Sequence, residues 1–224
     1  MASRRADDHT AGGSSTTHVL GVVLAAGAGR RMGGPKALVG PLASGTSLSG
    51  REGSTHPCEH ISGVSPLERV CGWVHQAGVD TVLGVIGSHA DQVRAVVLAR
   101  PWLVLVEATA WAEGMGASLR AGLQAASECG ADAVLVTLVD LPDVRTPVYR
   151  RFLTETRLQT NTLARASFHG TPGHPVLIGR KWWPLVTDSA QGDQGARAVF
   201  ANHPHVLVEC GDLATGRDVD TPQG

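Results

Sequence analysis

Residues 24–38 read Leu-Ala-Ala-Gly-Ala-Gly-Arg-Arg-Met-Gly-Gly-Pro-Lys-Ala-Leu, and they follow an apolar run, residues 18–24, that is typical of a buried first strand. The glycines let the backbone turn tightly and approach a ligand closely. Arg30, Arg31 and Lys36 add positive charge to the same turn. Backbone N–H groups beside fixed positive charge suit a polyphosphate. The stretch therefore predicts a nucleotide-phosphate site at the carboxyl end of the first strand.

Other interpretations of these glycines fit less well. A glycine-rich connection with solvated arginines needs no function, because glycine motifs also match by chance. The P-loop requires Gly-Lys-Ser/Thr, whereas Lys36 stands between Pro35 and Ala37. The dinucleotide fingerprint requires two residues between its last glycines, whereas three separate Gly29 from Gly33, and no second strand ending in an acid follows. A nicotinamide-dependent oxidoreductase is therefore disfavoured.

Length and composition favour one soluble domain. The chain has 224 residues, of which 42% are hydrophobic, enough for a single α/β domain over residues 18–224. A formal net charge of −1 argues against a nucleic-acid partner. The four cysteines form no CxxC pair, as expected of reduced thiols in the cytoplasm, and no apolar run could cross a membrane. Residues 1–17 lack the apolar region of a secretory signal and are expected to be a disordered leader.

Apolar runs and helical periods alternate along the chain. Further strands are expected at residues 81–86, 102–106, 132–139, 163–168 and 206–208, and helices at residues 66–77, 89–99, 145–159 and from near 118 and 192. The helix over residues 89–99 is expected to bury Val93, Val96 and Val97. Residues 40–65 have no apolar period and are expected to be a flexible inserted loop. The alternation predicts an α/β fold with parallel, right-handed βαβ connections.

Asp140 ends the most hydrophobic of the expected strands. Open α/β sheets bind ligands at the carboxyl ends of their central strands. A carboxylate there, together with the phosphate site, favours coordination of Mg²⁺. The structural alternative is a cap for the helix that follows.

Ser118 and His174 have two interpretations each, and Asp193 has one. Ser118, expected at a helix start, either binds a phosphate or base edge or simply caps the helix. His174, between Gly173 and Pro175 in a turn-rich stretch, either contacts an acceptor or bonds the loop backbone. Asp193 is a plausible N-cap of the helix after it.

Taken together, these motifs resemble the molybdenum-cofactor nucleotidyltransferases. The matching segments run in the family's order and cover nearly everything from Val19 onward: residues 24–36, 111–120, 138–142, 173–175, 192–197 and 218–222. Ala-Ala-Gly at 25–27, Gly-His-Pro at 173–175 and Gly-Asp-Gln-Gly-Ala-Arg at 192–197 resemble the cytidylyltransferase branch. The resemblance implies a three-layer αβα fold with a mainly parallel, Rossmann-like sheet, of the nucleotide-diphospho-sugar transferase type.

The resemblance also implies an activity and a set of residues. The reaction would move CMP from CTP to the phosphate of Mo-molybdopterin, with Mg²⁺ as cofactor and a molybdoenzyme as a possible recipient. Arg31 and Lys36 would contact the triphosphate, Asp140 and Asp220 (with Asp218 as the weaker match) would hold the metal, and His174 and Asp193 would contact the acceptor. The nucleotide site would comprise Leu24, Ala25, Ala26, Gly27, Gly29, Arg31, Lys36 and Ser118. Alternatives are GTP as donor, another phosphorylated acceptor, or a non-catalytic carrier of a pterin cofactor.

Overall fold

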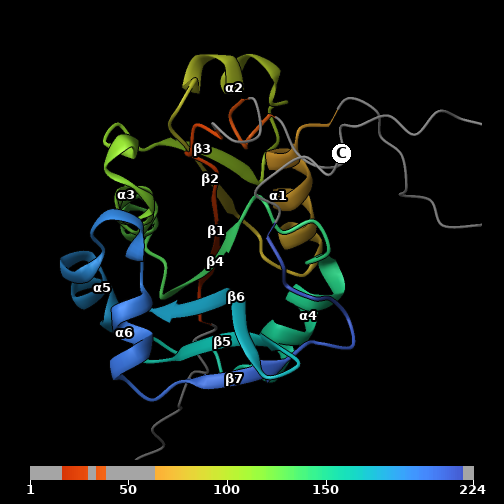
Figure 1. Cartoon of the computed structure of the whole chain (residues 1–224), viewed down its shortest axis with the longest axis vertical. Helices are drawn as coiled ribbons and strands as arrows, with labels where there is room; N and C mark the ends of the chain where they lie inside the picture. Colours follow the sequence, from red (N-terminus) through yellow and green to blue (C-terminus); the bar gives the residue numbers. More distant parts are fainter. Residues whose placement is uncertain (1–16, 30–33, 39–63, 219–224) are drawn as a thin grey trace, which may run out of the picture.

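The strand that leads into the glycine-rich stretch is β1, Val19–Leu24, and it lies inside a seven-stranded sheet. The computed structural model describes residues 17–29, 34–38 and 64–218. The strand order is β3-β2-β1-β4-β6-β5-β7 (Figure 1). The other strands are β2 Val82–Ile86, β3 Leu103–Glu107, β4 Ala133–Leu138, β5 Leu163–Phe168, β6 Thr171–Gly179 and β7 Val206–Glu209. The predicted α/β class with a mainly parallel sheet is confirmed.

Helices cover both faces of this sheet, as Figure 1 shows. On one face α1 and α4 enclose one apolar cluster with β1 and β4, and on the other α3, α5 and α6 enclose a second cluster. The helices are α1 Pro66–Gln76, α2 Ala90–Val96, α3 Met115–Glu128, α4 Thr146–Glu155, α5 Trp183–Ser189 and α6 Arg197–Asn202. Short 3₁₀ turns are η2 Trp111–Glu113, η3 Arg180–Trp182 and η4 Gly192–Gln194. The described residues therefore form the predicted three layers.

Helix α1 begins where the sequence predicts. Ser65 is its N-cap, and the Ser65 hydroxyl accepts a hydrogen bond from the Glu68 N–H while the Glu68 carboxylate accepts one from the Ser65 N–H. Helix α2 is shorter than predicted, ending at Val96. The Val96 side chain is 51% exposed, so the prediction that it faces inward is wrong, although Val93 is buried.

Strand β6 was not predicted, because its first half contains two prolines and a glycine that favour turns. It runs antiparallel to both β4 and β5. Pairing with β4 ends at Val136 opposite Val176, and beyond it β6 pairs with β5 at Thr171 and Pro172, after a shift in register. Prolines are tolerated there because the β4-side edge is open at this level. The turn-rich stretch around His174 is therefore part of a strand that extends beyond the β4 pairing.

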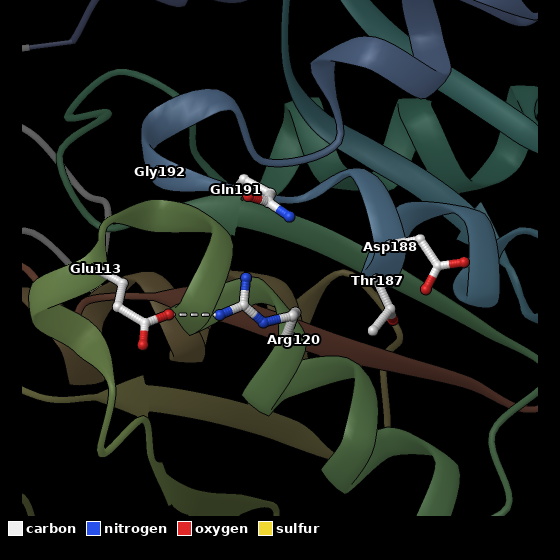
Figure 2. Close-up of a pocket in the computed structure, with 6 residues that line it drawn as sticks. All are labelled: Glu113, Arg120, Thr187, Asp188, Gln191 and Gly192. Atoms are coloured by element: carbon white, nitrogen blue, oxygen red, sulfur yellow. Dashed lines mark hydrogen bonds and ion pairs between the residues drawn. The ribbon is translucent and has the colours of Figure 1, made fainter.

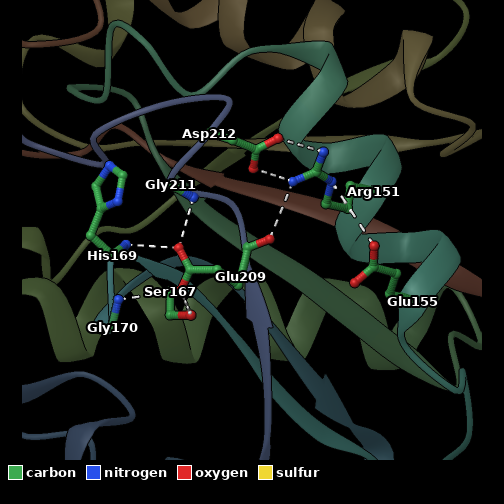
Figure 3. A network of polar contacts seen from close by, with 8 residues as sticks. All are labelled: Arg151, Glu155, Ser167, His169, Gly170, Glu209, Gly211 and Asp212. Carbon is green, nitrogen blue, oxygen red and sulfur yellow. Dashed lines mark hydrogen bonds and ion pairs between the residues drawn. The ribbon is translucent and has the colours of Figure 1, made fainter.

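A carboxylate holds the turn between β5 and β6 to strand β7. The Glu209 side chain accepts hydrogen bonds from the Ser167 hydroxyl (2.7 Å) and from the backbone N–H groups of His169 (2.7 Å), Gly211 (2.8 Å) and Gly170 (3.2 Å) (Figure 3). These donors stabilise the ionised form and lower the pKa of Glu209 to about 2. Beside them, Arg151 from α4 forms an ion pair with Asp212.

The Glu209 contacts predict an acid-sensitive contribution to stability. Because the pKa is lower in the folded state, this contribution is present above pH 4.5 and is lost as pH falls from 4.5 toward 2. Glu209→Gln is expected to lower the Tm at neutral pH and to flatten its acid dependence, in melts recorded from pH 7 to pH 2. Glu128→Gln, at an exposed acid of α3, is the control. Parallel pH profiles for wild type and Glu209→Gln would contradict this role.

A hydrogen bond between two side-chain hydroxyls lies inside the core. Thr137 on β4 and Tyr149 on α4 are both fully buried, and their hydroxyl oxygens are 3.1 Å apart. Burial raises the pKa of Tyr149 far above its usual value, so the phenol stays neutral. The bond joins the central strand that precedes Asp140 to the helix that follows it.

Removing either hydroxyl leaves the other buried without this partner. Tyr149→Phe and Thr137→Val are each expected to lower the free energy of unfolding by about 1–3 kcal/mol, measured by urea denaturation. The double variant is expected to lose less than the sum, because it leaves neither hydroxyl behind. Strictly additive losses would mean that the hydrogen bond contributes no coupling energy.

Candidate active site

Two loops leave the sheet at the same edge because β1 and β4 are parallel neighbours. Leu24 pairs with Leu138, and the Val139 N–H donates to the Leu24 carbonyl oxygen (3.2 Å). Residues 25–38 and 139–143 therefore start side by side at the carboxyl edge. Open α/β sheets bind ligands at this edge.

Lys36 and Asp140 meet across these loops. The Lys36 Nζ lies 2.6 Å from the Asp140 Oδ2, and the two side chains are 25% and 15% exposed. The other carboxylate oxygen, Asp140 Oδ1, is buried and has no hydrogen-bond partner among the described residues. Two residues predicted to act together thus lie in contact.

The turn that carries Lys36 depends on Gly29. Gly29 has a φ of 55°, and a Cβ there would lie 1.9 Å from the Gly34 carbonyl oxygen. The Gly34 N–H donates back to the Gly29 carbonyl (3.3 Å), and the Leu67 N–H of α1 donates to the Ala37 carbonyl (3.3 Å). Lys36 is therefore held in a closed turn that is joined to α1.

At the start of the glycine-rich stretch the backbone, rather than the side chains, is placed to contact a ligand. The side chains of Leu24, Ala25 and Ala26 are buried, whereas Gly27 is exposed. The Ser88 N–H, just after β2, donates to the Ala26 carbonyl (2.9 Å) and supports the stretch from the neighbouring strand. Ser88 was not predicted as part of the site. Its signal in the sequence is the pair Gly-Ser directly after an apolar strand.

Ser118 lies near the start of α3 but does not cap it. Helix α3 begins at Met115 with Gly114 as N-cap, so Ser118 lies within the first turns and is buried. The backbone and packing of Gly114, rather than the Ser118 hydroxyl, shape the helix end. A Cβ at Gly114 would lie 2.6 Å from the Gly192 carbonyl oxygen, so η4 packs directly on this end.

Asp193 contacts the start of a different helix from the one that it was predicted to cap. Its Oδ1 lies 3.4 Å from the Met115 N–H, at the start of α3. The next helix, α6, has Ala196 as N-cap and no side-chain cap. The expectation that Asp193 caps the following helix is therefore wrong. Segments far apart in sequence meet here because α3 and η4 pack together.

His174 lies on β6, in the segment that extends beyond the β4 pairing. Burial, followed by the charge of Arg165, lowers the pKa of His174 to about 4. Its imidazole is therefore neutral near pH 7 and could donate one hydrogen bond while accepting another.

A polar pocket of about 490 Å³ lies where α5 and η4 meet α3 (Figure 2). Its lining residues are Glu113, Arg120, Thr187, Asp188, Gln191 and Gly192. Arg120 bonds the Glu113 carboxylate (2.8 Å) and also the Ala190 carbonyl. Sequence reasoning did not find this pocket, because its residues come from two distant parts of the chain.

Several predicted residues lie outside the described part of the chain. They are Arg31, Asp220, the leader up to residue 16 and most of the inserted loop, residues 39–63. Within the described ranges no three His, Cys, Asp or Glu side chains gather to hold a metal ion. Asp140, with its unpartnered buried oxygen, fits one ligand of such an ion. No helix in these ranges is long and apolar enough to cross a membrane.

Comparison with known proteins gives the family. The model of the MobA-like NTP transferase domain matches residues 21–206. Nicotine blue oxidoreductase of Paenarthrobacter nicotinovorans is 33% identical over 91% of this chain and 92% of its own length. Purine catabolism protein PucB of Bacillus subtilis is 27% identical over 92% of this chain and 93% of its own.

The fold also matches solved structures. A nucleotidyl transferase from Methanothermobacter thermautotrophicus superposes with a TM-score of 0.69, at 21% identity, over 92% of this chain and 93% of that one. Three observations are consistent with one family: the fold, the contact of Lys36 with Asp140 at the carboxyl edge, and the match of the family model over residues 21–206. The chain belongs to the MobA-like NTP transferase domain family.

Proposed function

We propose that this nucleotidyltransferase moves CMP from CTP to the phosphate of Mo-molybdopterin and releases pyrophosphate. The observation that carries the proposal is the contact between Lys36 and Asp140 at the carboxyl edge of the sheet. Family membership supports nucleotidyl transfer from a nucleoside triphosphate. The cytidylyl donor and the pterin acceptor rest on the motifs at residues 25–27, 173–175 and 192–197.

The chemistry needs charge neutralisation more than proton transfer. A phosphate oxygen of the acceptor attacks the α-phosphorus, a new P–O–P bond forms, the bond to the β-phosphate oxygen breaks, and pyrophosphate leaves. The attacking oxygen is already anionic near neutral pH, so no general base is required. In this proposal Lys36 and Arg31 bind the departing phosphates.

Asp140, with Asp220, would hold Mg²⁺, which when bound supplies positive charge to the phosphates. The unpartnered Asp140 Oδ1 supports this role, because a buried carboxylate oxygen without a donor favours a cation. Lys36 would remain beside the metal-binding acid and add to the positive charge. A molybdoenzyme would be the recipient of the finished cofactor.

Other assignments use the same fold. GTP or another phosphorylated acceptor would leave the chemistry unchanged, and a non-catalytic carrier would bind the pterin without turnover. The name of the relative that is 33% identical motivates an oxidoreductase as a second candidate. Against it, the glycine spacing after β1 differs from the dinucleotide fingerprint.

A donor panel separates these functions. The full chain is incubated with Mg²⁺, Mo-molybdopterin and CTP, GTP, ATP or UTP in turn, and pyrophosphate release is recorded. We expect release with CTP well above the others and dependent on the acceptor. Release with GTP alone would move the assignment to guanylyl transfer. Pterin binding without pyrophosphate would favour the carrier, and acceptor-dependent oxidation of NADH would favour the oxidoreductase.

Asp140→Asn is expected to lower turnover by at least ~100-fold, the usual scale for loss of an electrostatic catalyst. The change keeps the size of the side chain and removes the charge that faces Lys36 and the proposed metal. Initial rates at saturating donor and acceptor give the effect, and a matched melting curve checks the fold. Asp80→Asn, at an exposed acid, is the control. Turnover near the wild-type value would remove Asp140 from the mechanism.

A further inference from the structure

Three nitrogen-bearing side chains gather on the face of the sheet that α6 covers. Leu163 on β5 and Val176 and Ile178 on β6 belong to the apolar cluster on this face. Because side chains alternate along a strand, Arg165 points to this same face, and it is joined to the residue before His174 through the Gly173 carbonyl. The Arg165 guanidinium carbon lies 5.9 Å from the centre of the Phe200 ring of α6.

Arg165 is bound to neutral groups rather than to an acid. Its Nε donates to the Gly173 carbonyl (3.0 Å) and its second terminal nitrogen to the Pro172 carbonyl (3.4 Å). Among the described residues, no carboxylate lies within ion-pair distance of Arg165 or Arg197. Partial burial of a cation without an acid beside it is costly. Binding of an anion would offset this desolvation cost.

The charges lie close enough to interact. Burial lowers the pKa of Arg165, and the nearby charge of Arg197 lowers it further. Arg197 begins α6, which directly follows η4, and its side chain is exposed. Arg197 and Phe200 lie three residues apart on α6 and so share a face, and the Arg165 guanidinium lies over the Phe200 ring, which brings the two like charges near one another beside the neutral His174 imidazole. A phosphate dianion matches this arrangement, because guanidinium groups bind its oxygens by charge-assisted hydrogen bonds.

The position of His174 in the sheet suits a residue that contacts the phosphorylated acceptor. His174 lies two residues beyond the last β4–β6 pair, on the segment that extends toward the carboxyl edge where Asp140 lies. Lys36 lies beside Asp140 at this same edge. An acceptor phosphate held near His174 would therefore lie at the edge where the proposed donor site lies, as in-line displacement between the two substrates requires.

We propose that Arg165 and Arg197, with His174 beside them, bind the phosphate monoester of the acceptor. This inference rests on the proposed function and adds the residues that select the acceptor. Arg165 was not among the predicted site residues. Its signal in the sequence is a single arginine within the otherwise uncharged strand Leu-Ala-Arg-Ala-Ser-Phe.

Arg197→Gln tests the site in steady state, because its exposed side chain makes no contact that the fold of the described residues needs. Pyrophosphate release is measured over a matrix of CTP and Mo-molybdopterin concentrations. We expect the KM for the acceptor to rise tenfold or more while the KM for CTP stays within twofold. Arg197→Lys is expected to recover part of the loss, because it restores charge without the planar fork. Arg157→Gln, at another exposed arginine, is the control.

A second measurement does not depend on turnover. Inorganic phosphate is titrated into nucleotide-free protein that carries Lys36→Gln, which weakens the proposed triphosphate site, and the Kd is measured by calorimetry. Adding Arg197→Gln is expected to weaken phosphate binding tenfold or more, whereas adding Arg157→Gln is not. Arg165→Lys, checked by its melting curve, is expected to act in the same direction.

The outcomes separate the two proposals. If no donor releases pyrophosphate but phosphate binding depends on Arg197, the anion site stands and the proposed reaction falls. If pyrophosphate is released and the acceptor KM of Arg197→Gln equals that of wild type, the reaction stands and this site falls. A rise in the KM for CTP alone would assign the arginines to the donor and overturn the inference.

Discussion

The parallel pairing of β1 with β4 is the constraint on which the candidate site depends. Six residue pairs, from Val19 with Ala133 to Leu24 with Leu138, keep the two strands in register. Their carboxyl ends therefore coincide, and the loops that follow leave the sheet together. A lysine and an aspartate separated by 104 positions are brought to 2.6 Å by this register. Buried apolar side chains on both faces stabilise the pairing, so the site is built on a rigid part of the molecule.

The antiparallel strand β6 extends this arrangement to the other side of the edge. It enters between β4 and β5, and its first residues lie beyond the β4 pairing. His174 is positioned by this strand rather than by a flexible loop. Arg165 holds the same segment through two carbonyl groups, and Glu209 holds the turn before it through four donors. These hydrogen bonds stabilise a segment that its prolines and glycine would otherwise weaken as a strand.

Local charge matters more here than overall charge. The chain is almost neutral, yet basic side chains lie at the carboxyl edge and on the face beneath α6. Lys36 has the acid Asp140 beside it. This is expected where a lysine and a metal ion held by a carboxylate would both contact the phosphates of one nucleotide. Arg165 and Arg197 lie near each other without an acid within ion-pair distance among the described residues. This arrangement is expected where the substrate itself carries the anion. In the proposed displacement reaction, this difference would give the two groups separate roles.

The sequence by itself determined the elements whose causes are local. The apolar run of β1, the tight glycine turn after it, the start of α1 at Pro66 and the acid just beyond β4 could all be predicted, because each depends on neighbouring residues. Only the tertiary structure decided that Lys36 meets Asp140, that Asp193 lies at the start of α3, and that β6 is a strand. These depend on strand register and helix packing between segments far apart in the chain. Propensity and periodicity extend over a few residues and carry no information about such partners.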